Sequence, residues 1–204
     1  MMKQEKDYIR DIAEIRSMME RSSKFLSLSG WAGIMAGIYA LTGAYIATNV
    51  LGFNPDGVTG NSSASILHEV VLLAAVVLIL ALCTAVYFSF QRARKRGEKI
   101  WNATAKQLLI SMTVPFIAGS LLILVLISNG LIGLVAPISL LFYGLALFNA
   151  SKFTYNAVKV LGLTEIALGL LGCYAVEYGL LFWAVGFGVA HIVYGIYVYY
   201  RYER

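Results

Sequence analysis

Six long apolar stretches, separated by shorter polar segments, dominate the hydrophobic pattern of the chain. They cover residues 25–50, 66–90, 108–127, 131–148, 158–176 and 179–200. About 20 helical residues, each rising 1.5 Å, cross the roughly 30 Å of hydrocarbon in a bilayer. The pattern therefore predicts an all-α, polytopic membrane protein: a bundle of six transmembrane helices over residues 25–200, followed by a short cytoplasmic tail at residues 201–204.

The first 24 residues follow a different pattern. Tyr8, Ile12, Ile15 and Met19 recur at helical spacing, which predicts an amphipathic helix. Its charges are nearly balanced, with six basic and five acidic residues, whereas helices that lie on lipid are rich in Lys and Arg. We therefore expect residues 3–24 to pack against protein, either this chain, a second copy or a cytoplasmic partner. A solvated extension of the first span is the simpler alternative.

The distribution of basic residues predicts the orientation in the membrane. All 16 Lys and Arg lie in the N-terminal segment, in residues 91–107, between the fourth and fifth spans up to Lys159, or at the C-terminus. By the positive-inside rule, both termini are expected to face the cytoplasm, in a plasma or inner membrane. The densest cluster is expected to anchor this topology or to attract anionic lipid head groups. It contains Arg92, Arg94, Lys95, Arg96 and Lys99.

Composition agrees with this class and limits the functions. The apolar fraction is 59% and the charged fraction 13%, against about 45–50% and about 25% in soluble domains. The net charge of +5 is spread between spans, so the lipid bilayer and not nucleic acid is the expected partner. The chain contains no GxSxG, P-loop or Gly-rich dinucleotide motif, so we expect neither an enzyme nor a cofactor.

The last two spans each carry one ionisable residue in the middle. Glu165 and His191 are equidistant from the turn at Glu177–Tyr178, so an antiparallel hairpin places them at the same depth. That depth is roughly 12 Å from the cytoplasmic end of each span. We expect the two side chains to meet and to form a ligand or proton site, with Thr164 and Tyr194 as polar companions. A metal or haem site is weakly supported, because the chain has no HExxH or CxxC pattern.

Small residues predict where helices approach one another closely. Gly33 and Gly37 form a GxxxG pair in the first span, which suits packing inside the bundle or a homodimer. In the last hairpin, Gly169 and Gly172 share a helical face with the glutamate, and Gly188 and Gly195 share one with the histidine. We expect these two stripes to face each other. A match of Gly30, Ile34 and Gly37 with Gly162, Ile166 and Gly169 is within chance for glycine-rich helices.

The buried pair decides the functional hypotheses. A lone charged carboxylate in hydrocarbon is costly, so Glu165 is expected to be protonated or paired with His191. Ionisable residues inside membranes usually serve a function, which favours a proton-coupled or polar-solute site in a small transporter or channel, or a ligand-sensing pocket. The alternatives are a structural hydrogen bond that locks the hairpin, and a structural or regulatory membrane subunit that acts through the N-terminal helix.

Overall fold

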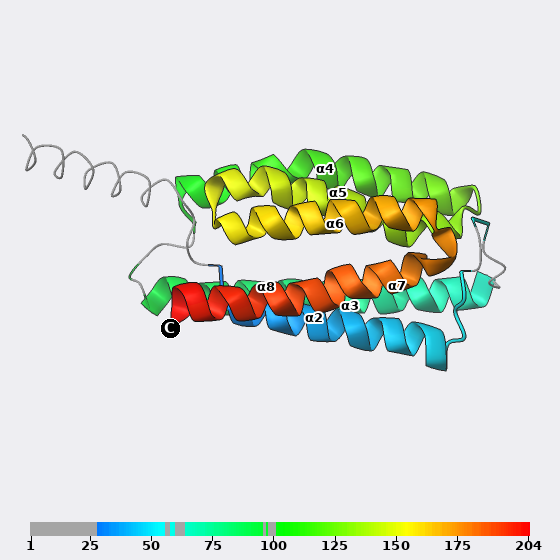
Figure 1. The fold of residues 1–204 in the computed structure, drawn as a ribbon, viewed down its shortest axis with the longest axis horizontal. Coiled ribbons are helices and arrows are strands. Elements are labelled where there is room, and N and C mark those ends of the chain that lie inside the picture. Colours follow the sequence, from blue (N-terminus) through cyan, green and yellow to red (C-terminus); the bar gives the residue numbers. More distant parts are fainter. Residues whose placement is uncertain (1–27, 56–57, 60–63, 96, 98–100) are drawn as a thin grey trace, which may run out of the picture.

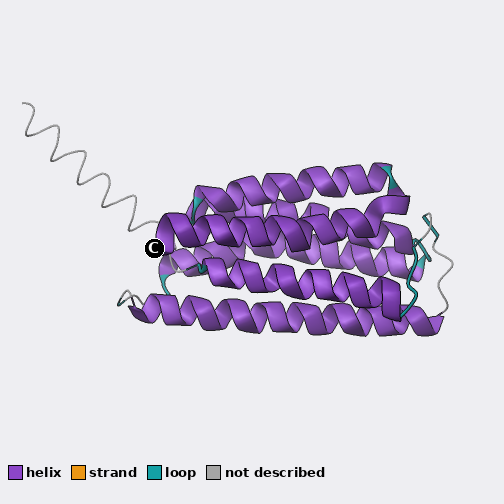
Figure 2. Cartoon of the chain, turned by 60° about the horizontal axis from the view of Figure 1, so that its bottom comes forward, coloured by secondary structure: helices purple, strands orange, loops and turns teal. Residues whose placement is uncertain are grey.

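Long helices run side by side through the part of the chain that the computed structural model describes (Figures 1 and 2). The described residues are 28–55, 58–59, 64–95, 97 and 101–204, and they contain no strand. The predicted helix at residues 3–24 lies outside them, as do Arg96 and Lys99. The α-helices are α2 (Gly30–Tyr45), α3 (Ala64–Lys95), α4 (Ala103–Ser128), α5 (Val135–Ala150), α6 (Asn156–Tyr174), α7 (Gly179–Trp183) and α8 (His191–Val198).

Shorter helical turns extend these elements. Three are π-helical: Ile46–Val50 after α2, Ala184–Ala190 between α7 and α8, and Tyr199–Glu203 after α8. Three are 3₁₀ turns: Ile132–Leu134, Ser151–Phe153 and Val176–Tyr178. With these extensions, six helices of the described part are long and apolar enough to cross a membrane. This confirms the prediction of a helical chain with six such segments; the orientation of the termini stays a prediction.

The ends of the middle helices differ from the predicted boundaries. The helix predicted to stop at residue 90 continues to Lys95, so Arg92 and Arg94 are helical and do not lie in a loop. The next helix begins at Ala103, five residues before the predicted start, because the Asn102 side chain accepts a hydrogen bond from the Ala105 N–H at 2.8 Å. Pro137 lies in the first turn of α5, where its missing N–H removes no hydrogen bond within the helix.

The helices form two layers of three (Figure 1). In one layer, α5 packs against both α4 and α6. In the other, α2 packs against both α3 and the last helix, made of α7, the π segment and α8. Contacts between the layers are concentrated where α7 meets α5 and α6, with fewer between α6 and α8. We call the first layer the α5 half and the second the α2 half.

The basic residues of the described helices gather at one end of the bundle, where the C-terminus also lies (Figure 1). We call it the basic end. It carries Arg92, Arg94, Lys95, Lys106, Lys152, Lys159, Arg201 and Arg204, at the end of α3, the start of α4, the α5–α6 connection and the C-terminus. α2 and α6 run away from the basic end, and α5 and α8 run towards it.

Glycines determine which helices approach most closely. A Cβ on Gly33 would lie 3.2 Å from the His191 carbonyl of α8, and one on Gly195 would lie 2.5 Å from the Gly30 carbonyl of α2. A Cβ on Gly169 would lie 2.9 Å from the Pro137 carbonyl of α5. Each of these helix pairs therefore needs residues without side chains at its contact.

The prediction that the two stripes of the last hairpin face each other is wrong. The α6 stripe, with Gly169 and Gly172, packs on α5, where Pro137 and Leu141 receive it. The stripe of the last helix packs on α2: Gly188 meets Leu41, and Gly195 meets Gly30 and Ile34. The GxxxG pair Gly33–Gly37 is likewise used inside the bundle, against Gly188, His191, Ile192 and Gly195 of the same chain.

Candidate functional site

Glu165 and His191 lie together in the interior, between the two halves of the bundle. Glu165 is on α6 and is fully buried, and His191 begins α8 with 5% of its surface exposed. The His191 Nδ1 and the Glu165 Oε1 are 3.3 Å apart. Equal distance from the turn was thus sufficient to bring the two side chains to one place, although the glycine stripes around them face other helices.

The His191 ring has a partner on each nitrogen. Nδ1 lies 3.0 Å from the Gly186 carbonyl, five residues earlier in the chain, and therefore donates to it when protonated. Nε2 lies 2.9 Å from the Tyr143 hydroxyl of α5. The π-helical register of residues 184–190 has one extra residue per turn, and Gly186 belongs to this segment. The imidazole thus bridges the α2 half, to which it belongs, and the α5 half.

Glu165 is less well accommodated than its histidine neighbour. Neither carboxyl oxygen has a hydrogen-bond partner among the described residues, and both are buried. One oxygen lies so close to Gly186 that a Cβ there would collide with it, and the same Cβ would lie 2.6 Å from Leu140. Gly186 therefore provides the space that the carboxyl group occupies. Most buried polar groups in proteins are hydrogen-bonded, so this pair of bare oxygens is an exception that calls for a cause.

The two predicted companions of the pair differ in position. Thr164 is exposed on the outer face of α6, and its hydroxyl donates to the Val160 carbonyl at 3.0 Å, so the structure places it away from the pair. Tyr194 is half-buried and lines a cavity together with His191 and Tyr143.

Sequence reasoning did not identify Tyr143 or Gly186. The usable signal for Tyr143 was its position: tyrosines favour the ends of spans at the head-group level, whereas this one is in the middle of α5. Gly186 gave no comparable signal, because its role depends on the π-helical register before His191.

The cavity beside the pair has a volume of about 170 Å³ and lies between the two halves. Its wall is mostly apolar, with polar groups from Tyr143, Tyr194, His191, Ser29 and Thr154. Glu165 does not line it and reaches it only through His191 and Tyr143. Ser29 and Thr154 are next to the basic end, so the cavity extends from there to the histidine in the interior.

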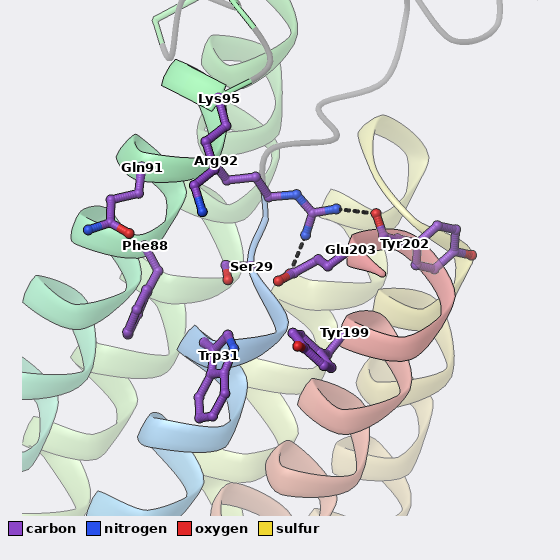
Figure 3. A pocket seen from close by; sticks show the side chains of 9 residues that line it. All are labelled: Ser29, Trp31, Phe88, Gln91, Arg92, Lys95, Tyr199, Tyr202 and Glu203. Atoms are coloured by element: carbon purple, nitrogen blue, oxygen red, sulfur yellow. Dashed lines mark hydrogen bonds and ion pairs between the residues drawn. The ribbon is translucent and has the colours of Figure 1, made fainter.

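A second polar centre lies at the basic end, around Arg92 (Figure 3). The guanidinium pairs with Glu203, and it donates to the Leu28 carbonyl at 2.6 Å, the Tyr202 carbonyl at 2.8 Å and the Tyr155 hydroxyl at 3.1 Å. Glu203 also accepts from the Gly30 N–H. We call this group the Arg92 cluster; it joins α3, the start of α2, the C-terminal turn and, through Tyr155, the start of α6.

The Arg92 cluster changes the interpretation of one predicted anchor. Arg92 is only 8% exposed and its guanidinium is bonded within the chain, so it does not project towards lipid head groups. Arg94 and Lys95 are exposed on the same turn. Beside the cluster, a larger pocket of about 550 Å³ is completed by Ser29, Trp31, Phe88, Gln91, Lys95 and Tyr199 (Figure 3).

Metal binding has no structural support in the described ranges, because no group of three His, Cys, Asp or Glu side chains there is close enough to hold an ion. Comparison with protein-family models, with curated proteins and with solved structures finds no match to this chain. The function must therefore be argued from the two polar centres and the cavity between them.

Proposed function

We propose that the chain is a small, non-enzymatic membrane protein with an intramembrane proton site at Glu165 and His191, and that it uses this site in proton-coupled movement of a small solute. The observation that carries the proposal is the fully buried carboxyl group, which lies 3.3 Å from a histidine nitrogen and has no hydrogen-bond partner among the described residues. A structural lock would be expected to satisfy both oxygens, since an unpaired buried acceptor costs about 1–3 kcal/mol.

The charge of the pair depends on a single proton. The pair is neutral when a protonated carboxyl stands beside neutral imidazole, or when a carboxylate faces imidazolium. Loss of one proton leaves a net negative charge, which burial opposes strongly. Among the described residues, His191 is the ionisable group paired with Glu165, and the Tyr143 hydroxyl is bonded to the other nitrogen of the imidazole.

The ring of His191 offers a route for that proton between the cavity and Glu165. A proton taken up at Nε2, on the Tyr143 side, allows the Nδ1 proton to leave towards Oε1 of Glu165. The carboxylate becomes a neutral carboxyl, and the imidazole returns to its neutral form with the proton on Nε2. Histidine suits this exchange because an imidazole ring can gain or lose a proton near neutral pH and has two nitrogens that can carry it.

Infrared difference spectroscopy in lipid nanodiscs tests the proposal. We expect a protonated-carboxyl band that appears or disappears as the pH changes, that is lost in Glu165→Gln and that persists in Glu177→Gln, whose side chain is exposed in the α6–α7 connection. Circular dichroism should show that both variants are folded. A band that survives in Glu165→Gln, or no pH-dependent carboxyl band at all, would show that Glu165 does not exchange protons.

A regulatory subunit is the second candidate, and the Arg92 cluster favours it. The cluster fixes the Leu28 carbonyl and the Gly30 N–H, directly after the N-terminal segment that was predicted to contact a partner. The two candidates differ in a complementation test in a deletion strain. Removal of residues 1–24 should abolish complementation if regulation is the function, whereas Glu165→Gln should then be silent. The reverse result supports the proton site.

A further inference from the structure

The two closest helix pairs in the bundle make the same atomic contacts. In the α2 half, a Cβ on Gly195 would lie 2.5 Å from the Gly30 carbonyl oxygen, 2.6 Å from the Ile34 nitrogen and 2.8 Å from the Ile34 Cγ1. In the α5 half, a Cβ on Gly144 would lie 2.7 Å from the carbonyl of Gly162, 2.7 Å from the nitrogen of Ile166 and 2.8 Å from its Cγ1. The same three atom types occur in the same order.

The agreement continues two turns further along the helices. A Cβ on Gly37 would meet the carbonyl of residue 188 and the nitrogen of residue 192, and a Cβ on Gly169 would meet the carbonyl of residue 137 and the nitrogen of residue 141. Residues of α2 thus correspond to residues of α6 at a constant shift of 132, and residues of α5 correspond to residues of the last helix at a constant shift of 51. The sequence match between residues 30–37 and residues 162–169 is within chance, but the matched residues make the same packing contacts.

The correspondence also preserves direction. α2 and α6 both run away from the basic end, and α5 and α8 both run towards it (Figure 1). The equivalent residues Tyr143 and Tyr194 line the same cavity, as do the equivalent residues Leu161 and Ser29. Equivalent side chains that meet across one space indicate a local two-fold axis along the bundle, with the cavity on it. Repeats related by an axis along the membrane normal occur in transporters, which hold their solutes between the repeats.

The two pairs differ where the proton site lies. Glu165 of α6 corresponds to Gly33 of α2, and His191 of α8 corresponds to Leu140 of α5. A Cβ on Gly33 would lie 3.1 Å from the Tyr194 ring. The position in α2 that is equivalent to Glu165 therefore has no side chain, and the Tyr194 ring packs against it. The cavity is therefore asymmetric: both halves contribute a tyrosine to its wall, but only the α2 half contributes a histidine.

We infer that this cavity binds a small neutral solute, about the size of a benzene ring, with one hydrogen-bonding group. An apolar cavity of about 150 Å³ accepts benzene, and the volume here is about 170 Å³. No Lys, Arg, Asp or Glu lines the wall, which disfavours an ion, and the lining residues Tyr143 and Tyr194 each bring a hydroxyl for a single polar atom. The inference names the class of solute for the proposed function. Only the transport of this solute rests on the proposed function; its binding rests on the cavity.

Fluorine NMR with 4-fluorophenol and fluorobenzene in lipid nanodiscs measures the binding directly. We expect a protein-bound resonance for both probes. Tyr194→Phe should weaken 4-fluorophenol about fivefold, the equivalent of one hydrogen bond of about 1 kcal/mol, and leave fluorobenzene unchanged. Ala36→Leu should abolish both signals, because Ala36 lines the cavity and a larger side chain there would fill it. The equivalent residue of α6 is a leucine, Leu168, so the shared packing register accepts this side chain. Ala167→Leu, on the exposed face of α6, is the matched control.

The outcomes separate this inference from the proton site. Glu165→Gln should bind 4-fluorophenol within a few-fold of the wild-type chain, since Glu165 does not line the cavity. If neither probe gives a bound signal, or if Ala36→Leu and Ala167→Leu behave alike, the solute site is refuted, and the infrared result for Glu165 stands by itself. Should Ala36→Leu fail to fold, the contrast between the two probes in Tyr194→Phe decides the question.

Discussion

Replacing Arg92 by methionine tests whether this residue holds the bundle together or anchors it in the membrane. The matched control is Arg94→Met, which removes the same charge from the same helical turn. Arg92 is 8% exposed and bonded to Glu203 and to the carbonyls of Leu28 and Tyr202, whereas Arg94 is exposed. An anchoring role predicts similar effects for both substitutions, and a structural role predicts a large difference.

The magnitude follows from what remains after the substitution. Removing one partner of a buried ion pair costs about 3–5 kcal/mol, because the other charge is left unpaired. Glu203 keeps the Gly30 N–H as a donor and its side chain is 14% exposed, so the lower end applies. We expect Arg92→Met to lower the free energy of unfolding by about 3 kcal/mol, roughly two orders of magnitude in the folding equilibrium. Arg94→Met should change it by less than about 0.5 kcal/mol.

Unfolding in mixed micelles by increasing amounts of SDS, followed by tryptophan fluorescence, measures this difference. Trp31 packs on Tyr199 beside the cluster, with ring centroids 5.8 Å apart, and reports on it directly. Arg92→Lys should recover less than half of the loss, because an ammonium group lacks the planar fork that reaches several acceptors at once. Equal and small losses in Arg92→Met and Arg94→Met would refute the structural role.

Two further predictions concern glycines. Gly186→Ala should destabilise the fold by about 1–3 kcal/mol, because its Cβ meets Glu165 and Leu140, and Glu165→Ala should relieve part of that loss in a double-mutant cycle of SDS unfolding. Additive losses would contradict this contact. Gly144→Ala and Gly195→Ala should each lower stability by a similar amount in the same assay, since each new Cβ meets the same three atom types; a neutral result for one of them alone would argue against equivalent packing.

The sequence was most informative about how deep a residue lies in its span and least informative about which helices pack against each other. The number of long apolar segments follows from length and hydrophobicity alone, and the meeting of Glu165 and His191 follows from their equal distance to one turn. The glycine stripes were assigned to the wrong partners because a stripe marks where a helix is approached but carries no information on which helix approaches it. Here α5, the preceding helix, receives the stripe of α6, and α2, distant in sequence, receives the stripe of the last helix.

Features that depend on helix register were also beyond sequence reasoning. Arg92 joins its cluster because α3 continues five residues past the predicted end, which carries the guanidinium to the C-terminal turn. The contact from His191 to Gly186 spans five residues and belongs to a π-helical segment that an α-helical pattern does not predict. Both departures occur at polar centres, where a local change of helix geometry serves a specific hydrogen bond and not the general packing.

In the proposed function, the position of Glu165 and His191 between the halves gives this pair direct control over their contact. Glu165 and Tyr143 belong to the α5 half and His191 to the α2 half, so the imidazole is the polar link between the two layers in the interior. At the far end, α7 packs on α5 and α6, while towards the basic end the halves meet beside the cavity through the Arg92–Tyr155 hydrogen bond and the stacked rings of Tyr155 and Tyr202. In the proposed function, a change of one charge at this link alters the attraction between the halves beside the cavity. Proton binding and solute access would then share one bistable interface, and no longer chain of coupled residues is required.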